Sequence, residues 1–376
     1  MISSLLSRRQ FSIAAGAALV AGFHPARAQD DRIVLGQSAA FTGPAAQLGI
    51  QFHAGAKLYF DQHNAQGGGR RNIEIRQMDD GYEPDRCAAN TKKLIDDDVF
   101  ALFGYIGTPT SVAALPLATR ARVPFFAPFT GAMALRDPFS RTTFHVRASY
   151  NDETALIVKQ LTSLGLKKIA VFYQNDAYGK AGLDGVTLAL AAQNLKPVAQ
   201  ATVERNSVDV AAAVTALTAA APDAVVQISA YKSCAAFIRA ARKAGYGGTY
   251  YNVSFVGTQA LADELGKDGA GVVVSQVVPS PYNAARPITR EFADAVKRAG
   301  NVQVNFSSME GYLAAKVFAE GLRRGGKATR DGLISGLESI SDLSFGGFQV
   351  GFSPSNHVAS KFVELSMLTG DGRVRT

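Results

Sequence analysis

Short apolar runs alternate with longer amphipathic segments along the first third of the chain. Helical spacing of apolar residues, as over Gly49–Asn64, separates runs that have the length of buried strands. The expected strands are Arg32–Ala39, Ile73–Met78, Val99–Phe103 and Val123–Ala127. This strand–helix alternation predicts a parallel sheet with helices on both faces.

The alternation restarts after Arg147 and predicts a second sheet of similar size. Its expected strands are Lys168–Tyr173, Lys196–Thr202, Ala224–Ser229, Thr249–Val253 and Gly271–Val278. Its expected helices are Asp152–Leu164, Leu183–Gln193, Asp209–Ala220 and Phe237–Ala244. We therefore predict an α/β fold with two Rossmann-like lobes, each built on a doubly wound parallel sheet.

Changes of partner between the elements predict a three-segment hinge. The crossovers are expected near Ala148-Ser149, near Val278-Pro279-Ser280-Pro281 and near Ser355-Asn356-His357. Helices over Ile288–Arg298, Gly311–Arg323 and Arg330–Leu337 would return to lobe one, and a strand over Lys361–Leu368 would join lobe two. Residues 29–148 and 279–357 would form lobe one, and residues 149–278 and 358–376 lobe two. Because open α/β sheets bind ligands at the carboxyl ends of their strands, a site is expected between the lobes.

The first residues have the features of an export signal. Ser7-Arg8-Arg9-Gln10-Phe11 is a twin-arginine pattern, and an apolar run over Ile13–Phe23 follows it. Ala26-Arg27-Ala28 offers a cleavage site before Gln29. An ordinary secretion signal can also contain an Arg pair, so the route stays open, but both routes end in the periplasm. The apolar run is too short for a stable membrane anchor. We expect residues 1–28 to be a removed signal peptide and the mature protein to be periplasmic.

Composition narrows the function classes. The chain has 376 residues and a formal charge of +8, of which Arg8, Arg9 and Arg27 would leave with the signal. The remaining basic residues are scattered, without a stripe of interleaved aromatics, so nucleic-acid binding is not supported. Length and hydrophobic content fit two globular lobes.

Cysteine and histidine usage gives no sign of a metal or of catalysis. Cys87 and Cys234 lie in predicted helices of different lobes, which indicates two buried free thiols. Metal-ligand spacing is absent, and none of the five histidines lies in a catalytic motif. We expect no cofactor, no metal and no enzymatic activity.

A series of short motifs resembles a known family in order and spacing. The motifs are Phe41-Thr42-Gly43-Pro44, Asp79-Asp80, Gly104, Val123-Pro124, Asp176-Ala177-Tyr178-Gly179, Ala244-Gly245-Tyr246 and Glu310-Gly311-Tyr312. Over nearly the whole mature chain they resemble the branched-chain amino acid (Leu/Ile/Val) group of type I periplasmic solute-binding proteins. The resemblance implies two lobes that close on a small ligand, with the permease and ATPase of an ABC importer as partners. We expect a monomer.

The resemblance also implies ligand-binding positions. Thr108 would offer a hydroxyl to a ligand carboxylate, although it could instead cap the helix that follows. The loop of Phe129, Thr130 and Gly131 would supply backbone N–H groups, although Gly131 could serve only turn geometry. Tyr178 and Tyr231 would close over the ligand from lobe two, although both could pack at the lobe surface.

Two departures from the family pattern change the expected ligand. Ser254 stands where the family has a Glu that pairs with the ligand's ammonium, and Leu48 stands where an aromatic is expected. Because a buried ammonium without a carboxylate is costly, we expect a carboxylate ligand that lacks an α-ammonium group. Such a ligand would be an aromatic or branched-chain acid; another acid, Asp152 or Glu153, would have to reach the cleft if an amino acid is bound. Tyr82 and Gly107 occupy the places of the family's first-lobe disulfide.

Two other protein classes share this lobe pair. A periplasmic sensor that reports to a membrane receptor would use the same ligand closure, so the sequence does not separate it from transport. A repressor would carry a DNA-binding helix pair at the end that the export signal occupies. Glu310 and Asp79-Asp80 are expected to have structural roles.

Overall fold

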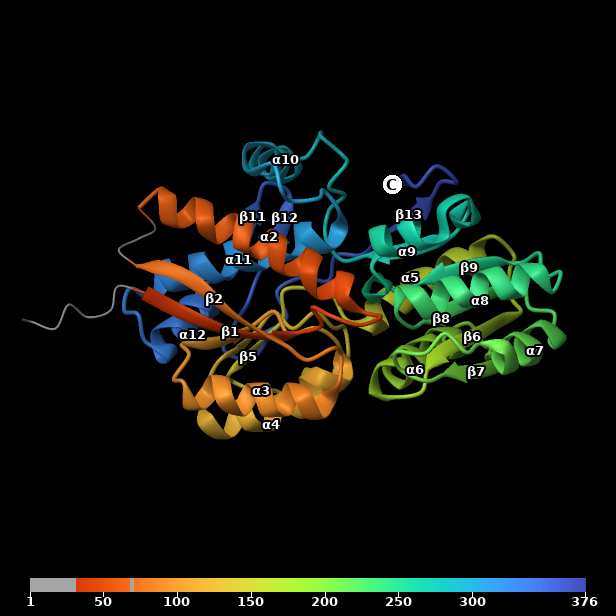
Figure 1. Cartoon of the computed structure of the whole chain (residues 1–376), viewed down its shortest axis with the longest axis horizontal. Coiled ribbons are helices and arrows are strands. Elements are labelled where there is room, and N and C mark those ends of the chain that lie inside the picture. Colours follow the sequence, from red (N-terminus) through yellow and green to blue (C-terminus); the bar gives the residue numbers. More distant parts are fainter. Residues whose placement is uncertain (1–31, 68–70) are drawn as a thin grey trace, which may run out of the picture.

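Two sheets lie side by side in the computed structural model, each in its own lobe (Figure 1). The structure describes residues 32–67 and 71–376. The predicted signal, with its cleavage site at Ala28 and Gln29, lies outside the described residues. The predicted two-lobed α/β fold is confirmed, whereas the predicted limits of the lobes remain our own division of the chain.

Sheet one is parallel throughout. In spatial order its strands are β2 (Asn72–Asp79), β1 (Arg32–Ala39), β3 (Ala101–Phe103), β4 (Phe125–Phe126) and β5 (Thr143–Phe144). Strands β1, β3 and β4 are almost entirely buried, as expected for a parallel sheet with helices on both faces. Helices α2 and α11 lie on one side of β1 and β2, and α3 and α4 lie on the other (Figure 1).

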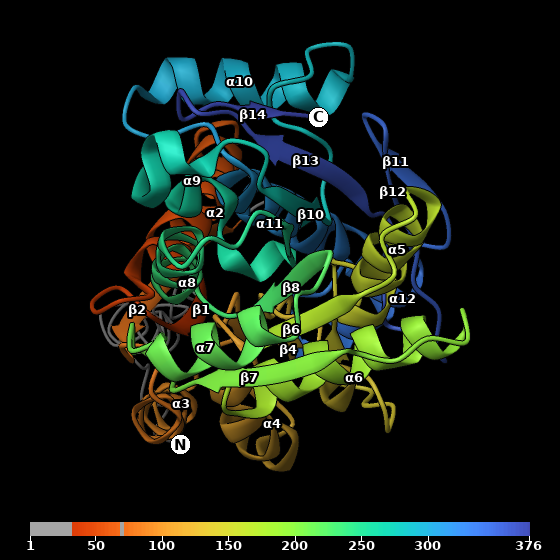
Figure 2. The ribbon, with the colours of Figure 1, turned by 90° about the vertical axis from the view of Figure 1, so that its right-hand side faces the viewer.

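Sheet two extends a parallel core with an antiparallel edge. In spatial order its strands are β14 (Val374–Arg375), β13 (Glu364–Leu368), β10 (Val273–Gln276), β9 (Thr249–Asn252), β8 (Ala224–Ile228), β6 (Ile169–Gln174) and β7 (Ala199–Val203). Strands β13 and β14 are the antiparallel ones. In Figure 2, β7, β6, β8, β10, β13 and β14 follow one another from the bottom of the view to the top.

The helices agree with the sequence prediction in number and order more closely than in length. They are α2 (Ala46–Ala65), α3 (Pro84–Asp96), α4 (Thr108–Ala121), α5 (Tyr150–Ser163), α6 (Ala177–Ala191), α7 (Ala211–Ala219), α8 (Tyr231–Lys243), α9 (Thr258–Leu265), α10 (Pro287–Ala299), α11 (Phe306–Gly325) and α12 (Arg330–Glu338). The sequence analysis did not predict α9, β5, β14 or the hairpin of β11 (Leu343–Phe345) and β12 (Phe348–Val350).

Two glycines allow α11 to pack closely on α2. A Cβ atom at Gly311 would collide with the Phe52 carbonyl oxygen, and one at Gly55 with the Ser308 carbonyl oxygen. Side chains are therefore excluded where the two backbones meet. This close approach fixes the start of α11, including the neighbouring Glu310, against the rest of lobe one.

The segment that first crosses from lobe one to lobe two lies beside the segment that makes the last crossing. After β5, the His145 amide donates to the His357 carbonyl (2.8 Å), and the Ala359 amide donates back to the His145 carbonyl (2.8 Å). The first passage ends at Ser149, whose hydroxyl accepts from the Asp152 amide and starts α5 with a capping box. Arg147 therefore lies within the passage, between the last strand of sheet one and the first helix of lobe two.

Ion pairs and hydrogen bonds join the lobes at the end of β7. Arg205 bonds Glu83 at the start of α3 (2.9 Å) and also pairs with Asp176 of its own lobe (3.3 Å). The neighbouring Asn206 donates to Glu83 (2.7 Å) and to the Gly81 carbonyl (3.2 Å). These contacts hold lobe two against the α3 end of lobe one.

Replacing Arg205 with Met should loosen this contact. We expect a larger radius of gyration in small-angle X-ray scattering and a loss of about 0.5–1 kcal/mol in the free energy of unfolding, because the pair is partly exposed. Arg373→Met is the matched control, since Arg373 pairs with Asp371 inside lobe two (3.5 Å). Equal scattering and stability in both variants would show that the pair does not hold the lobes together.

Candidate functional site

The loops at the carboxyl ends of the strands meet between the two lobes. From lobe one come the loop before α4 and the loop after β4; from lobe two come the starts of α6 and α8 and the turn at Ser254–Val256. This is the position at which open α/β sheets bind ligands.

Thr108 and Thr130 form a buried hydroxyl pair. Their Oγ1 atoms are 2.7 Å apart, and both side chains are shielded from solvent. Thr108 is the first residue of α4, whose N-cap is Gly107, and no side chain caps this helix. The alternative in which Thr108 acts as the cap is therefore wrong.

The backbone amides of the loop after β4 have acceptors nearby. The Phe129 amide donates to the Tyr105 carbonyl (2.7 Å), and the Thr130 amide donates to the Pro128 carbonyl (2.8 Å). Burial raises the pKa of Tyr150, whereas Arg147 and hydrogen bonds from the Thr130 side chain and the Gly131 backbone lower it. A Cβ atom at Gly131 would meet the Tyr150 backbone and ring, so the glycine is required by close packing rather than by an unusual φ.

Aromatic rings from both lobes form a layer around Phe255. The ring centroid of Phe255 is 4.6 Å from Tyr178, 5.7 Å from Phe129 and 5.8 Å from Tyr82. Tyr150 extends the layer, at 5.5 Å from Tyr178. The buried Tyr178 hydroxyl has no hydrogen-bond partner in the part of the chain that is described. Tyr178 and Phe129 are thus brought together as predicted site residues, with Phe255, Tyr82 and Tyr150 as additions.

Leu48 and Tyr231 each contact a different residue of the opposite lobe. The Tyr231 hydroxyl accepts a hydrogen bond from the backbone of Gln47, which lowers its pKa, but burial has the larger effect and raises it. The Leu48 side chain lies so close to Gly257 that a Cβ atom there would collide with it. These two predicted residues therefore flank the aromatic layer through partners of their own.

Arg147 is a buried guanidinium at the centre of this region. Its side chain is 1% exposed and lies over the Phe129 ring, 4.8 Å from the centroid. It donates to the Ser254 hydroxyl and to Glu153 (3.4 Å), and its Nη1 is 3.6 Å from Glu310. Burial lowers the pKa of Arg147, but Glu310 and Glu153 outweigh burial and raise it. Nε and Nη1 lack hydrogen-bond partners among the described residues.

Glu153 is fully occupied by its neighbours. One oxygen accepts from the Ser254 amide (2.7 Å) and the Ser275 hydroxyl (2.6 Å). The other accepts from the Ser254 hydroxyl (3.0 Å) and from Arg147. An acid therefore does reach Ser254, but its charge is already paired.

Glu310 is the less satisfied of the two acids. It is buried, and its one recorded partner among the described residues is Arg147. Burial raises the pKa of Glu310 to about 7; Glu153 adds to this rise, whereas Arg147 and Arg136 oppose it. Arg136 in turn donates to the carbonyls of Thr130 and Arg147, and burial lowers its pKa to about 10.

The positions of the family's disulfide are in contact without cysteines. A Cβ atom at Gly107 would collide with the Tyr82 ring, so the tyrosine fills this place. Its hydroxyl accepts from Gln174 of lobe two (3.2 Å). The prediction of two buried free thiols, Cys87 and Cys234, is confirmed.

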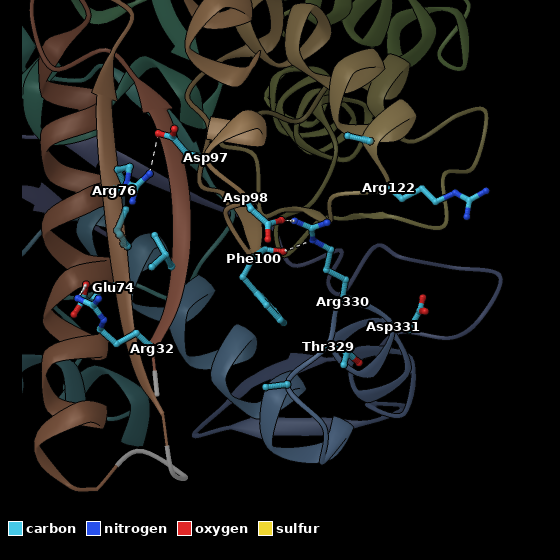
Figure 3. A pocket seen from close by; sticks show the side chains of 14 residues that line it. Arg32, Glu74, Arg76, Asp97, Asp98, Phe100, Arg122, Thr329, Arg330 and Asp331 are labelled. Atoms are coloured by element: carbon cyan, nitrogen blue, oxygen red, sulfur yellow. Dashed lines mark hydrogen bonds and ion pairs between the residues drawn. The ribbon is translucent and has the colours of Figure 1, made fainter. Parts of the chain in front are cut away.

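Two surface hollows lie on lobe one, away from the loops that meet between the lobes. The larger, of about 1030 Å³, lies beside β1 and β2, and several of its charged side chains pair with one another (Figure 3). Arg76 pairs with Asp97 (2.9 Å) and Arg330 with Asp98 (2.8 Å). The second, of about 720 Å³, lies between α2, α11 and β11. Neither includes a residue of the Thr108–Thr130 pair or of the aromatic layer.

In the described ranges, no helix combines the length and the apolar composition that crossing a membrane requires. Within the same ranges, no group of three or more His, Cys, Asp or Glu side chains is placed to hold a metal ion.

Comparison with known proteins gives the family. The family model described as "Periplasmic binding protein" matches residues 32–372. The chain belongs to this family. A crystal structure of a possible leucine/isoleucine/valine-binding protein from Rhodopirellula baltica SH 1 is 33% identical, with a TM-score of 0.87 over 92% of this chain and 96% of that one. A substrate-binding periplasmic protein from Ralstonia solanacearum is 31% identical, with a TM-score of 0.85 over 91% and 99% of the two chains.

A curated relative points the same way. This periplasmic binding protein is 27% identical over 329 residues to the Leu/Ile/Val-binding protein homolog 7 of Brucella suis biovar 1 (strain 1330), covering 82% of this chain and 80% of the relative. The resemblance to the Leu/Ile/Val-type group is confirmed. Membership implies a periplasmic location and the binding of small ligands, because the family and its neighbours are substrate-binding proteins.

Glu310→Gln should change how stability depends on pH. The raised pKa of Glu310 means that its protonated form contributes stability below about pH 4.5, which is lost as pH rises through about 7. Gln keeps the neutral shape without titrating. Wild type should therefore lose about 3 kcal/mol relative to the variant between pH 4.5 and pH 7.5, followed by chemical denaturation. Parallel stability curves would contradict the raised pKa.

Proposed function

We propose that this periplasmic binding protein captures a small carboxylate between its lobes and delivers it to the permease and ATPase of an ABC importer. Its signal peptide, residues 1–28 with a twin-arginine motif, would be removed on export, and the mature protein would act as a monomer. Family membership supports transport as the general role. The proposed ligand class rests on one observation: both carboxylate oxygens of Glu153 already accept hydrogen bonds from Arg147, Ser254 and Ser275.

The lobe-one side of the site suits an anion. In the Thr108–Thr130 pair one hydroxyl donates to the other, and a ligand oxygen could replace Tyr150 as the acceptor of the second hydroxyl proton. The Gly131 amide and the start of α4 add donors and the positive end of a helix dipole. A ligand carboxylate placed here would meet donors and no acidic side chain of the loop.

The lobe-two side does not suit an ammonium group. Ser254 carries no charge, and both oxygens of Glu153 are engaged by Ser254, Ser275 and Arg147. An ammonium group would have to compete with the Arg147 guanidinium for this carboxylate. Bringing a further cation beside Ser254, where both oxygens of Glu153 are already engaged, is costly.

The aromatic layer suits the apolar body of the ligand. Phe255 of lobe two contacts Tyr178 of its own lobe and Phe129 of lobe one, and all three are buried. Small-molecule sites combine such apolar walls with a few fixed polar groups. A branched-chain or aromatic acid, or the corresponding amide, matches this lining.

Isothermal calorimetry with leucine and its deaminated analogue, 4-methylpentanoate, tests the ligand class. The two compounds share the carboxylate and the branched body and differ in the ammonium group. We expect 4-methylpentanoate to bind more tightly by ~2 kcal/mol or more, about 30-fold, because the ammonium would lack a free carboxylate partner beside Ser254. Tighter binding of leucine would contradict the proposal.

Thr108→Ala should weaken binding of 4-methylpentanoate by about 1–3 kcal/mol, the value of a charge-assisted hydrogen bond left unmade. Thr110→Ala is the matched control. Thr110 is equally buried at the start of α4, but its hydroxyl donates to the Ile106 and Gly107 carbonyls. Equal affinities of the two variants, measured by calorimetry, would remove Thr108 from the binding site.

A further inference from the structure

Four charged groups meet in the passage between the lobes. Arg147 and Arg136 supply two positive charges, and Glu153 and Glu310 supply up to two negative ones. When Glu310 is ionised, the group is neutral. A ligand carboxylate would add a negative charge to a region from which water is excluded, and such a charge is costly unless another change compensates it.

Glu153 and Glu310 differ in how many hydrogen bonds their carboxylates accept. Glu153 accepts four hydrogen bonds, so its ionised form is fully solvated by the protein. Glu310 has Arg147 as its one recorded partner in the described structure, at 3.6 Å, beyond hydrogen-bond distance. A proton on Glu310 therefore disrupts fewer hydrogen bonds than a proton on Glu153 would.

Other titratable groups around α11 have partners of their own. These are His53 on α2, which interacts with Gln37, Lys57 and Asp61; Glu338 on α12, which bonds His357; and Glu264 on α9, which pairs with Arg239. The charged groups that act on Glu310 are Arg147, Glu153 and Arg136.

The predicted anion position and Glu310 lie beside the same two cations. Arg136 donates to the Thr130 carbonyl (3.2 Å), and Arg147 lies over the ring of Phe129, the residue before Thr130. Both arginines act on Glu310. We expect a carboxylate held at the Thr108–Thr130 pair to compete with Glu310 for these cations, which favours the protonated form of Glu310.

We propose that Glu310 takes up a proton from solvent when the lobes close on a ligand carboxylate, so that capture of the anion is coupled to capture of a proton. The inference rests on the proposed function. The ligand stays ionised, the proton binds a Glu310 carboxyl oxygen, and the buried charge stays balanced. A zwitterionic ligand would do the opposite, because its ammonium would favour ionised Glu310 and release the proton.

The coupling has a definite pH dependence. The pKa of Glu310 is about 7 in the closed arrangement without a ligand, and an added anion raises it further. Affinity for a carboxylate is then greatest below pH 7 and falls as pH rises above it, by up to about tenfold per pH unit for one proton. Both values lie well above the pKa of the ligand, so the ligand's own titration does not contribute.

Calorimetry of 4-methylpentanoate binding at pH 7.5, in phosphate and in Tris, measures the proton directly. The two buffers differ in ionisation enthalpy, so the difference in heat gives the number of protons exchanged. We expect wild type to take up about half a proton or more, because Glu310 is mostly ionised at this pH before binding. Glu310→Gln should take up none. Glu364→Gln is the matched control, since Glu364 also has a raised pKa, caused by burial, but lies on β13 beside Arg286; it should behave as wild type.

Absence of proton uptake in wild type would overturn the proposal, as would equal uptake by the Glu310→Gln variant. If that variant does not fold, the wild-type affinity decides: it should weaken from pH 6.5 to pH 8.5, and a constant value would overturn the coupling. Failure of the ligand class gives a different result. Leucine would then bind more tightly than 4-methylpentanoate, and the same calorimetry should show proton release by wild type and none by the Glu310→Gln variant.

Discussion

A guanidinium buried between two lobes is the constraint on which the rest of this site depends. Arg147 has almost no contact with solvent, and an unpaired charge in such a place would be strongly destabilising. Its partners come from different parts of the chain: Glu310 from α11 of lobe one, Glu153 and Ser254 from lobe two. Arg147 therefore links the closed arrangement of the lobes to the charge balance of the site.

Local features of the sequence place each partner of Arg147. The capping box at Ser149 starts α5 and so fixes Glu153, one turn into the helix. The contact of Gly311 and Gly55 with the facing backbones brings the beginning of α11, in which Glu310 is the fifth residue, close to α2. Neither feature is part of the ligand site. Both position the groups that decide which ligand charge the site accepts.

Sequence patterns predicted the two lobes because strands such as β1 and helices such as α10 are long enough to show a period. Two-residue strands such as β5 and β14 have none, and α9 carried no signal that we used. The placement of Tyr178 and Phe129 at one site followed from strand ends and family resemblance, and both residues contact Phe255. Arg147 had no local signal, because its partner Ser254 is 107 residues away and a lone arginine resembles a surface residue. The acid near Ser254 was considered only as an alternative, and its pairing with Arg147 required the structure.

A crystal structure of the protein with 4-methylpentanoate tests the central claim most directly. The account predicts a ligand enclosed between the lobes, with its carboxylate within hydrogen-bond distance of the Thr108 hydroxyl and the Gly131 amide and its branched end against Tyr178 and Phe255. Arg147 would remain paired with Glu153. A ligand bound in one of the hollows of lobe one, or one whose carboxylate points away from the Thr108–Thr130 pair, would contradict it.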